Sequence, residues 1–249
     1  MASLSGRRAI VVGIGGRHGT AAVRALAGHG AEVIAVDRNP ASLRGLPAGV
    51  RPLACDMSEG AVADAITGLE GEGWPVDIVV TCPPLIADEA AAASVANLRD
   101  VLALTVEPAL AWTAAAAKAM APRRAGAIVH VTGLAGLGGF RGRVPAGAAF
   151  AAIHNLVQNF ALELAPSEVR VNALVPGVDA AESRAIAAIA GRPERDVVAR
   201  IPLGLTMPET AFADALLYLV HPGSTYVSGQ VLAVDGGWST WGRLHAVAT

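Results

Sequence analysis

Short apolar runs alternate with stretches of helical periodicity along the whole chain. Seven apolar runs predict β-strands at residues 8–13, 31–37, 51–56, 77–82, 127–132, 169–175 and 230–237. The stretches between them predict helices at residues 20–29, 58–69, 97–120, 146–165 and 210–220. Strands that are apolar almost throughout are typical of a parallel sheet with helices on both faces. The pattern therefore predicts one α/β domain over residues 1–249, with a doubly wound parallel sheet in three αβα layers.

Composition supports a large core and excludes several classes of partner. Apolar residues make up 53% of the 249 residues and charged residues only 16%. That balance favours helices packed on a sheet over disorder. The formal net charge of −2 lacks the basic excess of proteins that bind nucleic acid or anionic membranes. We therefore expect a small-molecule ligand, with no nucleic acid and no membrane as partner.

The remaining compositional features indicate a cytoplasmic protein. Cys55 and Cys82 are far apart and outside any metal-ligand spacing, so we expect neither a disulfide nor a metal site. The opening residues run directly into the first predicted strand without a signal-peptide pattern. The longest apolar run, residues 101–117, is interrupted by Glu107 and Pro108 and is too short to span a bilayer.

A glycine-rich turn follows the first predicted strand. It reads GIGGRHG and runs from Gly13 to Gly19, and the second strand ends at Asp37. Glycines let the backbone approach a pyrophosphate at a helix N-terminus, and an acid about twenty residues later suits a ribose hydroxyl. An acid there would also repel a 2′-phosphate. The spacing thus indicates that any dinucleotide would bind at Gly13, Gly19 and Asp37, with NAD preferred over NADP.

The segment FAAIHNLVQNFALELAPSEVRVNALVPG, residues 150–177, resembles the short-chain dehydrogenase/reductase family almost residue by residue. The resemblance implies a Rossmann-type sheet of seven strands. The family carries TGxxxGxG at its first turn, which places Arg17 where a glycine would stand. Arg17 would then either bind phosphate or obstruct it, and His18 would be a packed structural histidine. Asp56 matches the acid that holds the adenine, with a strand-end turn residue as the alternative.

The family's chemistry uses an Asn, a Ser, a Tyr and a Lys, and the same register places other residues at these positions. The four positions are occupied by Thr105, Gly133, Ala146 and Phe150. Residues 126–177 contain no Tyr and no Lys at all, so this difference needs no alignment. The Pro83-Pro84 pair also replaces the family's NNAG loop, where it removes two backbone donors. The resemblance therefore implies loss of the family's usual hydride transfer.

Few residues are available as a substitute acid or base. His154 lies one turn beyond Phe150 on the same helix, and the alternative is a packed core or interface histidine. Strand alternation predicts that His130 and Thr132 point away from the side of Gly133. The residues expected around a substrate cleft are Cys82, Leu134, Arg141, Arg143, Phe150, Gly177 and Asp179. For Arg141, Arg143, Asp179 and Glu182 the alternative is an ordinary solvated side chain.

Three hypotheses about function remain open at this point. The first is a non-redox catalyst, such as a cyclase, isomerase, lyase or dehydratase, that uses a rebuilt apolar cleft in secondary metabolism. The second is a catalytically silent subunit or ligand-binding regulator that partners an active paralogue. The third is an NAD-dependent oxidoreductase with a non-standard acid/base. The resemblance implies a homodimer or homotetramer, or a hetero-oligomer with that paralogue; NAD(H) is the one cofactor the sequence suggests.

Overall fold

Seven parallel strands form the centre of the molecule in the computed structural model, which describes residues 3–84 and 93–241. The strands are β1 (Arg8–Val12), β2 (Glu32–Asp37), β3 (Arg51–Ala54), β4 (Ile78–Thr81), β5 (Gly126–Val131), β6 (Val169–Pro176) and β7 (Val231–Val234). Their order across the sheet is β3-β2-β1-β4-β5-β6-β7. Because this order reverses between β1 and β4, the sheet is doubly wound. The predicted fold class, a seven-stranded Rossmann-type α/β sheet, is confirmed.

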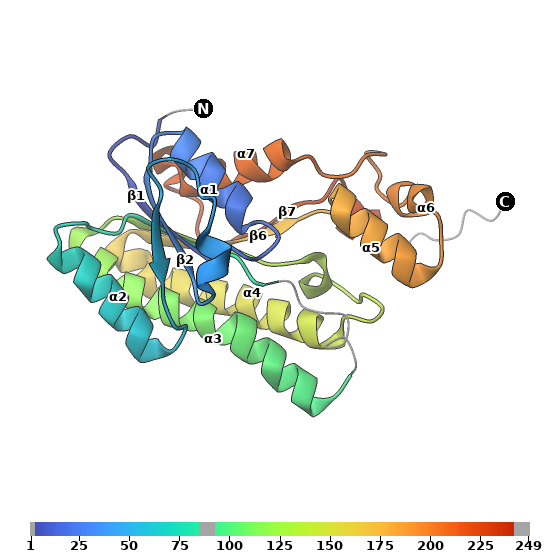
Figure 1. Cartoon of the computed structure of the whole chain (residues 1–249), viewed down its shortest axis with the longest axis horizontal. Helices are drawn as coiled ribbons and strands as arrows, with labels where there is room; N and C mark the ends of the chain where they lie inside the picture. Colours follow the sequence, from blue (N-terminus) through green and yellow to red (C-terminus); the bar gives the residue numbers. More distant parts are fainter. Residues whose placement is uncertain (1–2, 85–92, 242–249) are drawn as a thin grey trace.

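Helices cover both faces of this sheet (Figure 1). They are α1 (Gly19–Gly28), α2 (Glu59–Gly71), α3 (Val95–Met120), α4 (Val144–Leu164), α5 (Ala180–Ala190), α6 (Glu194–Val198), α7 (Glu209–Val220) and α8 (Trp238–Trp241). One face packs against α1 and α7, and the other against α2, α3 and α4. The sequence pattern predicted five of these helices but not α5, α6 or α8. Among the described residues no helix is long and apolar enough to cross a membrane.

Alternation along the strands divides the core into two layers. In β1, Ala9 and Val11 pack on the α1–α7 side, whereas Ile10 and Val12 pack on the α2–α3–α4 side. Successive residues of a strand point to opposite faces, so a strand buried on both faces must be apolar throughout. The edge strand β3 departs from this rule because most of its side chains are exposed. It also ends at Ala54, which leaves Asp56 in the following loop.

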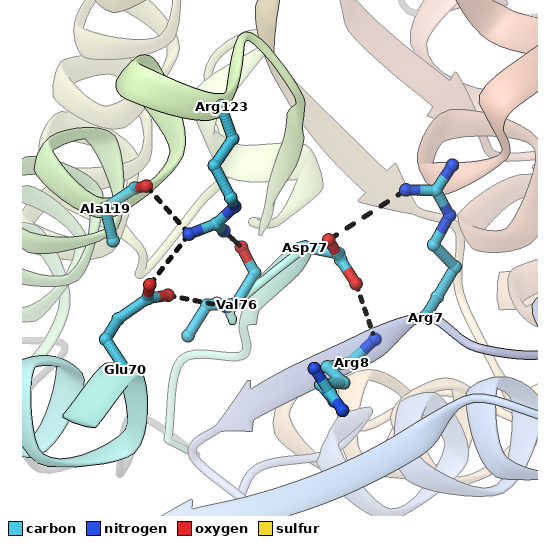
Figure 2. Close-up of polar contacts among 7 residues, drawn as sticks. All are labelled: Arg7, Arg8, Glu70, Val76, Asp77, Ala119 and Arg123. Carbon is cyan, nitrogen blue, oxygen red and sulfur yellow. Dashed lines mark hydrogen bonds and ion pairs between the residues drawn. The ribbon is translucent and has the colours of Figure 1, made fainter. Parts of the chain in front are cut away.

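Charged side chains connect neighbouring helices and strands at the amino ends of the central strands (Figure 2). Glu70 accepts a hydrogen bond from the Val76 backbone N–H at 2.8 Å and from Arg123 Nη1 at 2.8 Å. Arg123 in turn donates to the carbonyl oxygens of Val76, at 2.6 Å, and Ala119, at 2.9 Å. Nearby, Asp77 accepts from the Arg8 backbone N–H at 3.0 Å. These contacts tie α2 and α3 to the segment that leads into β4, at the amino ends of the strands.

Candidate functional site

A cavity of about 140 Å³ lies at the carboxyl ends of the strands, next to the point where the strand order reverses. This is the position at which open α/β sheets bind ligands. The lining residues are Arg17, His18, Pro83, Pro84, Thr132, Gly133, Leu134, Ala135, Phe140, Arg143, Ala146, Phe150, Pro176 and Glu182. They come from the β1–α1 turn, the loops after β4 and β5, α4, the end of β6 and α5. Sequence segments far apart in the chain therefore meet at this one edge of the sheet.

A second hollow, of about 360 Å³, lies between α5, α6 and Trp238. Its walls include Ile186, Ala190 and Val197, with Arg200 stacked on the Trp238 ring 5.0 Å from the ring centre. It is larger than the first cavity, but its walls include none of the residues at the β1–α1 turn or after β4 and β5. We therefore take the cavity at the strand ends as the candidate site.

The glycine turn between β1 and α1 is packed so closely that side chains are excluded. A Cβ on Gly13 would overlap the carbonyl oxygen of Cys82, and one on Gly16 would overlap that of Pro83. Gly13 also has φ +84°, a left-handed conformation that favours glycine. The turn is therefore held against the loop after β4, and the Pro83-Pro84 pair forms part of that contact.

Two acids follow β2 and β3. Asp37 is 8% exposed, and its Oδ2 and Oδ1 accept hydrogen bonds from the backbone N–H groups of Gly15, at 2.9 Å, and Asn39, at 2.8 Å. It thereby fixes the glycine turn to the end of β2. Asp56 is exposed and accepts from the Ser58 N–H at 2.8 Å, and the hydrogen bonds with Ser58 lower the pKa of its carboxyl.

Arg17 and His18 are both on the cavity wall, but they differ in their partners. Arg17 Nη1 donates to Asp179 Oδ1 at 2.9 Å, so the glycine turn is joined to the segment that opens α5. His18 stacks on Phe212 with ring centres 4.7 Å apart. Burial lowers the pKa of His18 to about 4, so the ring is neutral near pH 7. The interpretation of His18 as a packed histidine is confirmed.

The structure brings three of the four positions aligned with the family's catalytic residues to the cavity: Gly133, Ala146 and Phe150. A Cβ on Gly133 would lie 2.8 Å from Phe150 Cε2, so the phenyl ring occupies the space beside this glycine. The fourth, Thr105, is buried within α3, where its hydroxyl donates to the Val101 carbonyl oxygen at 2.6 Å. Thr105 therefore takes no part in the cavity wall.

Thr132 and His154 form a buried pair behind the cavity. Thr132 Oγ1 lies 2.9 Å from His154 Nε2, and the two residues are 4% and 8% exposed. Thr132 itself lines the cavity. Burial lowers the pKa of His154, and a hydrogen bond with the Gly136 backbone partly offsets this effect. The result is a hydroxyl at the cavity wall that is hydrogen-bonded to an imidazole held neutral near pH 7.

The predicted direction of Thr132 was wrong. Thr132 and the Cβ direction of Gly133 both face α4, since β5 ends at Val131 and the chain then turns into the short helix η4 (Leu134–Gly136). Thr132 keeps the face of Ile128 and His130, toward α3 and α4, and it is Gly133 that departs from the strand alternation. His130, within the strand, lies in a separate polar group instead, with Nδ1 2.7 Å from Thr81 Oγ1 and Nε2 2.9 Å from Thr113 Oγ1.

Of the other residues expected at a substrate cleft, some line the cavity and some do not. Leu134 and Arg143 line the cavity. Cys82 is buried, and burial raises the pKa of its thiol to about 12, which leaves it a packed residue rather than a nucleophile. Arg141 is exposed, and Gly177 packs against the backbone that follows β7. Among the described residues no cluster of His, Cys, Asp and Glu could hold a metal ion.

The residues at the strand ends suit a dinucleotide. The Asp37 oxygens each keep a free lone pair for a ribose hydroxyl, because a carboxylate accepts about four hydrogen bonds. The glycine turn leads into the N-terminus of α1, where backbone N–H groups and the helix dipole favour phosphate. Arg17 has donors left beyond the one bound to Asp179. The donor and acceptor set therefore matches adenosine and pyrophosphate groups.

Comparison with known proteins identifies a family of dehydrogenases and reductases. A family profile described as enoyl-(acyl carrier protein) reductase matches residues 15–239. The chain is 33% identical to galactitol 2-dehydrogenase (L-tagatose-forming) of Cereibacter sphaeroides, covering 96% of this chain and 97% of the relative. It is 32% identical to 2-dehydro-3-deoxy-D-gluconate 5-dehydrogenase of Bacillus subtilis strain 168, covering 95% and 96%.

Solved structures show the same similarity. One from Beutenbergia cavernae, described as a gluconate 5-dehydrogenase with bound NADP at low occupancy, superposes with a TM-score of 0.80. It shares 29% sequence identity, over 96% of this chain and 98% of the other. A nicotinamide dinucleotide is therefore a plausible cofactor for this fold, and the comparison does not choose between NAD and NADP.

These relatives overturn the first functional hypothesis. The prediction of a non-redox catalyst was wrong, because the matching relatives are named dehydrogenases and reductases and so indicate an oxidoreductase. With a profile match over most of its length and relatives aligned almost end to end, the chain belongs to the short-chain dehydrogenase/reductase superfamily.

Proposed function

We propose that this chain is a nicotinamide-dependent oxidoreductase that interconverts a secondary alcohol and its ketone. The observation that carries the proposal is the pair of Thr132, on the cavity wall, and His154 behind it, joined at 2.9 Å. The pair supplies a hydroxyl that can contact a substrate oxygen and a base that can take its proton. The redox assignment is supported by the relatives, and the acid/base assignment by this geometry.

The cofactor is held by residues from the first two strands. Asp37 would accept hydrogen bonds from the adenosine ribose, and the turn from Gly13 to Gly19 together with Arg17 would hold the phosphates. A carboxylate at the end of β2 favours NAD over NADP, since a 2′-phosphate there would meet a negative charge. When bound, a nicotinamide ring would supply a hydride acceptor for oxidation of the alcohol and a hydride donor for reduction of the ketone.

The proton follows a two-step path through this chain's own side chains. In oxidation, the substrate hydroxyl gives its proton to Thr132 Oγ1 while the proton of Thr132 passes to His154 Nε2. The lowered pKa of His154 keeps the imidazole neutral and able to accept a proton near pH 7. Thr132 touches the substrate and is the catalytic residue, whereas His154 acts through it as a positioning residue and proton store.

The wall beside this pair is apolar. In the register of the family, Gly133, Ala146 and Phe150 occupy the positions of the Ser, Tyr and Lys. We propose that the Thr132–His154 pair replaces them. The Phe150 ring packs on Gly133 and sits beside the cavity, where it limits the access of water to the reacting atoms.

An oxidation assay tests this proposal. Purified protein is mixed with NAD⁺ or NADP⁺ and with galactitol, other polyols, sugar acids and simple secondary alcohols, and reduced nicotinamide is followed by absorbance. We expect turnover of at least one alcohol, with NAD⁺ used more efficiently than NADP⁺. Binding of either dinucleotide without oxidation of any alcohol would contradict the proposal.

A further inference from the structure

Glu182 lines the same cavity as Thr132 but comes from a different part of the fold. It is the third residue of α5, which follows β6, whereas Thr132 follows β5. The residue is half-buried. A substrate held at Thr132 would therefore occupy a cavity that also contains a carboxyl group, and the mechanism above leaves that group unused.

The backbone around Glu182 explains an acid here but not the direction of its side chain. Asp179 caps α5 through Oδ1, which accepts from the Glu182 N–H at 2.8 Å. In a reciprocal capping box the acid three residues after the cap returns its carboxylate to the cap's own N–H. Glu182 makes no such bond. Among the described residues its carboxylate has no hydrogen bond or ion pair, and the side chain lines the cavity instead.

Charged side chains lie close to Glu182. Burial raises the pKa of the Glu182 carboxyl; Arg17 lowers it, Asp179 raises it and Arg143 lowers it. Arg17 is itself paired with Asp179, and Glu182 brings a negative charge to the cavity wall when it is ionised. His18 adds no charge near pH 7 because its pKa is about 4. Such a wall favours a ligand without net charge over one that brings its own carboxylate.

A half-buried carboxylate on a cavity wall, with no donor from the described part of the chain bound to it, is open to hydrogen bonds from a ligand. We propose that Glu182 is a specificity-determining residue that accepts hydrogen bonds from the hydroxyl groups of a neutral polyhydroxy substrate. The reacting oxygen of that substrate sits at Thr132, and a further hydroxyl lies at Glu182. This inference rests on the proposed oxidoreductase function and names its substrate class as neutral polyols and their ketoses.

Ligand binding without cofactor tests the inference separately from catalysis. The dissociation constant of galactitol is measured by calorimetry for the wild type, Glu182→Gln and Glu182→Ala, with galactonate and 2-butanol as the acidic and single-hydroxyl comparisons. Glu59→Gln is the matched control, an exposed acid in the first turn of α2. We expect galactitol binding to weaken about 10-fold or more in Glu182→Ala and less in Glu182→Gln, with no change in the control.

The same variants are then assayed for oxidation, where we expect kcat/KM for galactitol to fall and that for 2-butanol to stay level. Tighter binding of galactonate than galactitol to the wild type would overturn the inference. Equal galactitol affinity in the wild type and Glu182→Ala would overturn it as well, even if oxidation were observed. Failure of the wild type to oxidise any alcohol would instead overturn the proposed function, and the calorimetric comparison would still decide the role of Glu182.

Discussion

The Glu70–Arg123 group, at the amino ends of the strands, and the cavity wall with Thr132 and Glu182, at the carboxyl ends, differ in how their polar side chains are paired. At the amino ends of the strands, Glu70 and Arg123 are bonded to each other and to backbone groups of α3 and the start of β4. At the carboxyl ends, Glu182 has no partner among the described residues, and the Thr132 hydroxyl faces a cavity. A satisfied set of polar groups stabilises the fold, whereas a set with spare donors and acceptors can bind a ligand. The comparison assigns a role in stability to the Glu70–Arg123 group at the amino ends of the strands, and a role in chemistry to the cavity at the carboxyl ends.

The largest effect is expected at Thr132 and His154. Thr132→Val removes the relay hydroxyl and His154→Gln removes the base, and each should lower kcat about 100-fold or more, the usual contribution of general acid–base catalysis. Thr132→Ser keeps the hydroxyl and should retain most of the activity. Steady-state kinetics measure these changes, with cofactor affinity determined in parallel.

The pH profile of oxidation separates two explanations of a loss of activity in His154→Gln. If His154 is only structural, its replacement lowers the rate without changing the shape of the profile. Because burial lowers the pKa of His154, oxidation by the wild type should decline at a lower pH than an exposed imidazole would give. In His154→Gln that decline should disappear. An unchanged profile in the variant would remove His154 from the proton path.

The pH dependence of stability is the next largest effect, and it arises inside the sheet rather than at either edge. Thr113 donates its hydroxyl proton to the Ala109 carbonyl oxygen and so accepts from His130, whose other ring nitrogen accepts from Thr81. Burial lowers the pKa of His130 from 6.5 to about 4. The unfolded chain binds the proton at a higher pH than the folded one, so stability is full above pH 6.5 and falls toward pH 4.

This loss should be about 3 kcal/mol from His130 across that interval. Urea unfolding at a series of pH values measures it, and His130→Asn serves as the comparison. The variant is expected to be less stable near pH 7 but to lose less stability on acidification. Parallel pH curves for the two proteins would show that His130 is not the group responsible.

A smaller effect on stability is expected from Gly133→Ala. The new Cβ would lie 2.8 Å from Phe150 Cε2, and such overpacking costs about 1–3 kcal/mol. Gly138→Ala is the matched control, because a Cβ there would meet no atom within 4 Å. Adding Phe150→Leu to Gly133→Ala should restore most of the lost stability in thermal unfolding. If the single and double variants unfold alike, Phe150 does not pack on Gly133 as described.

The smallest changes are expected at the amino ends of the strands, and they concern only the free energy of unfolding. Arg123→Met breaks bonds to a partly buried carboxylate and two carbonyl groups and should lower the free energy of unfolding by about 1–3 kcal/mol. Arg51→Met, which breaks an exposed ion pair with Glu72, should change it by less than about 1 kcal/mol. Neither should alter kcat. A clear loss of kcat in Arg123→Met would contradict the claim that the amino ends of the strands contribute to stability and not to catalysis.

Local patterns were enough to predict most of the fold and the convergence of the residues proposed to hold a dinucleotide. The seven strands followed from apolar runs, and Gly13, Gly19 and Asp37 stand out because their spacing has a direct physical meaning. Parallel strands bring their carboxyl ends to one edge, so these residues had to converge. Helix α5 was missed because its alanine-rich stretch buries few side chains, among them Ser183 and Ala187.

The proton path and the role of Glu182 could not be predicted in the same way. Thr132 and His154 are 22 residues apart, and the alternation along β5 does not show which side chain of α4 Thr132 meets. Glu182 fits a helix-capping pattern that predicts a bond to the backbone, and only the packed structure shows it at a cavity instead. The non-redox hypothesis failed for a related reason, because a register that places other residues at the family's catalytic positions does not exclude a redox reaction.

Hydride transfer itself tests the central claim most directly. Wild-type protein is incubated with NAD⁺ and galactitol carrying deuterium on its secondary carbinol carbons, and the isolated nicotinamide and sugar are analysed by mass spectrometry. The account predicts one deuterium in each reduced nicotinamide and one ketose formed for each. A sugar product without deuterated nicotinamide, or no transfer from galactitol or any other deuterated secondary alcohol to either dinucleotide, would contradict it.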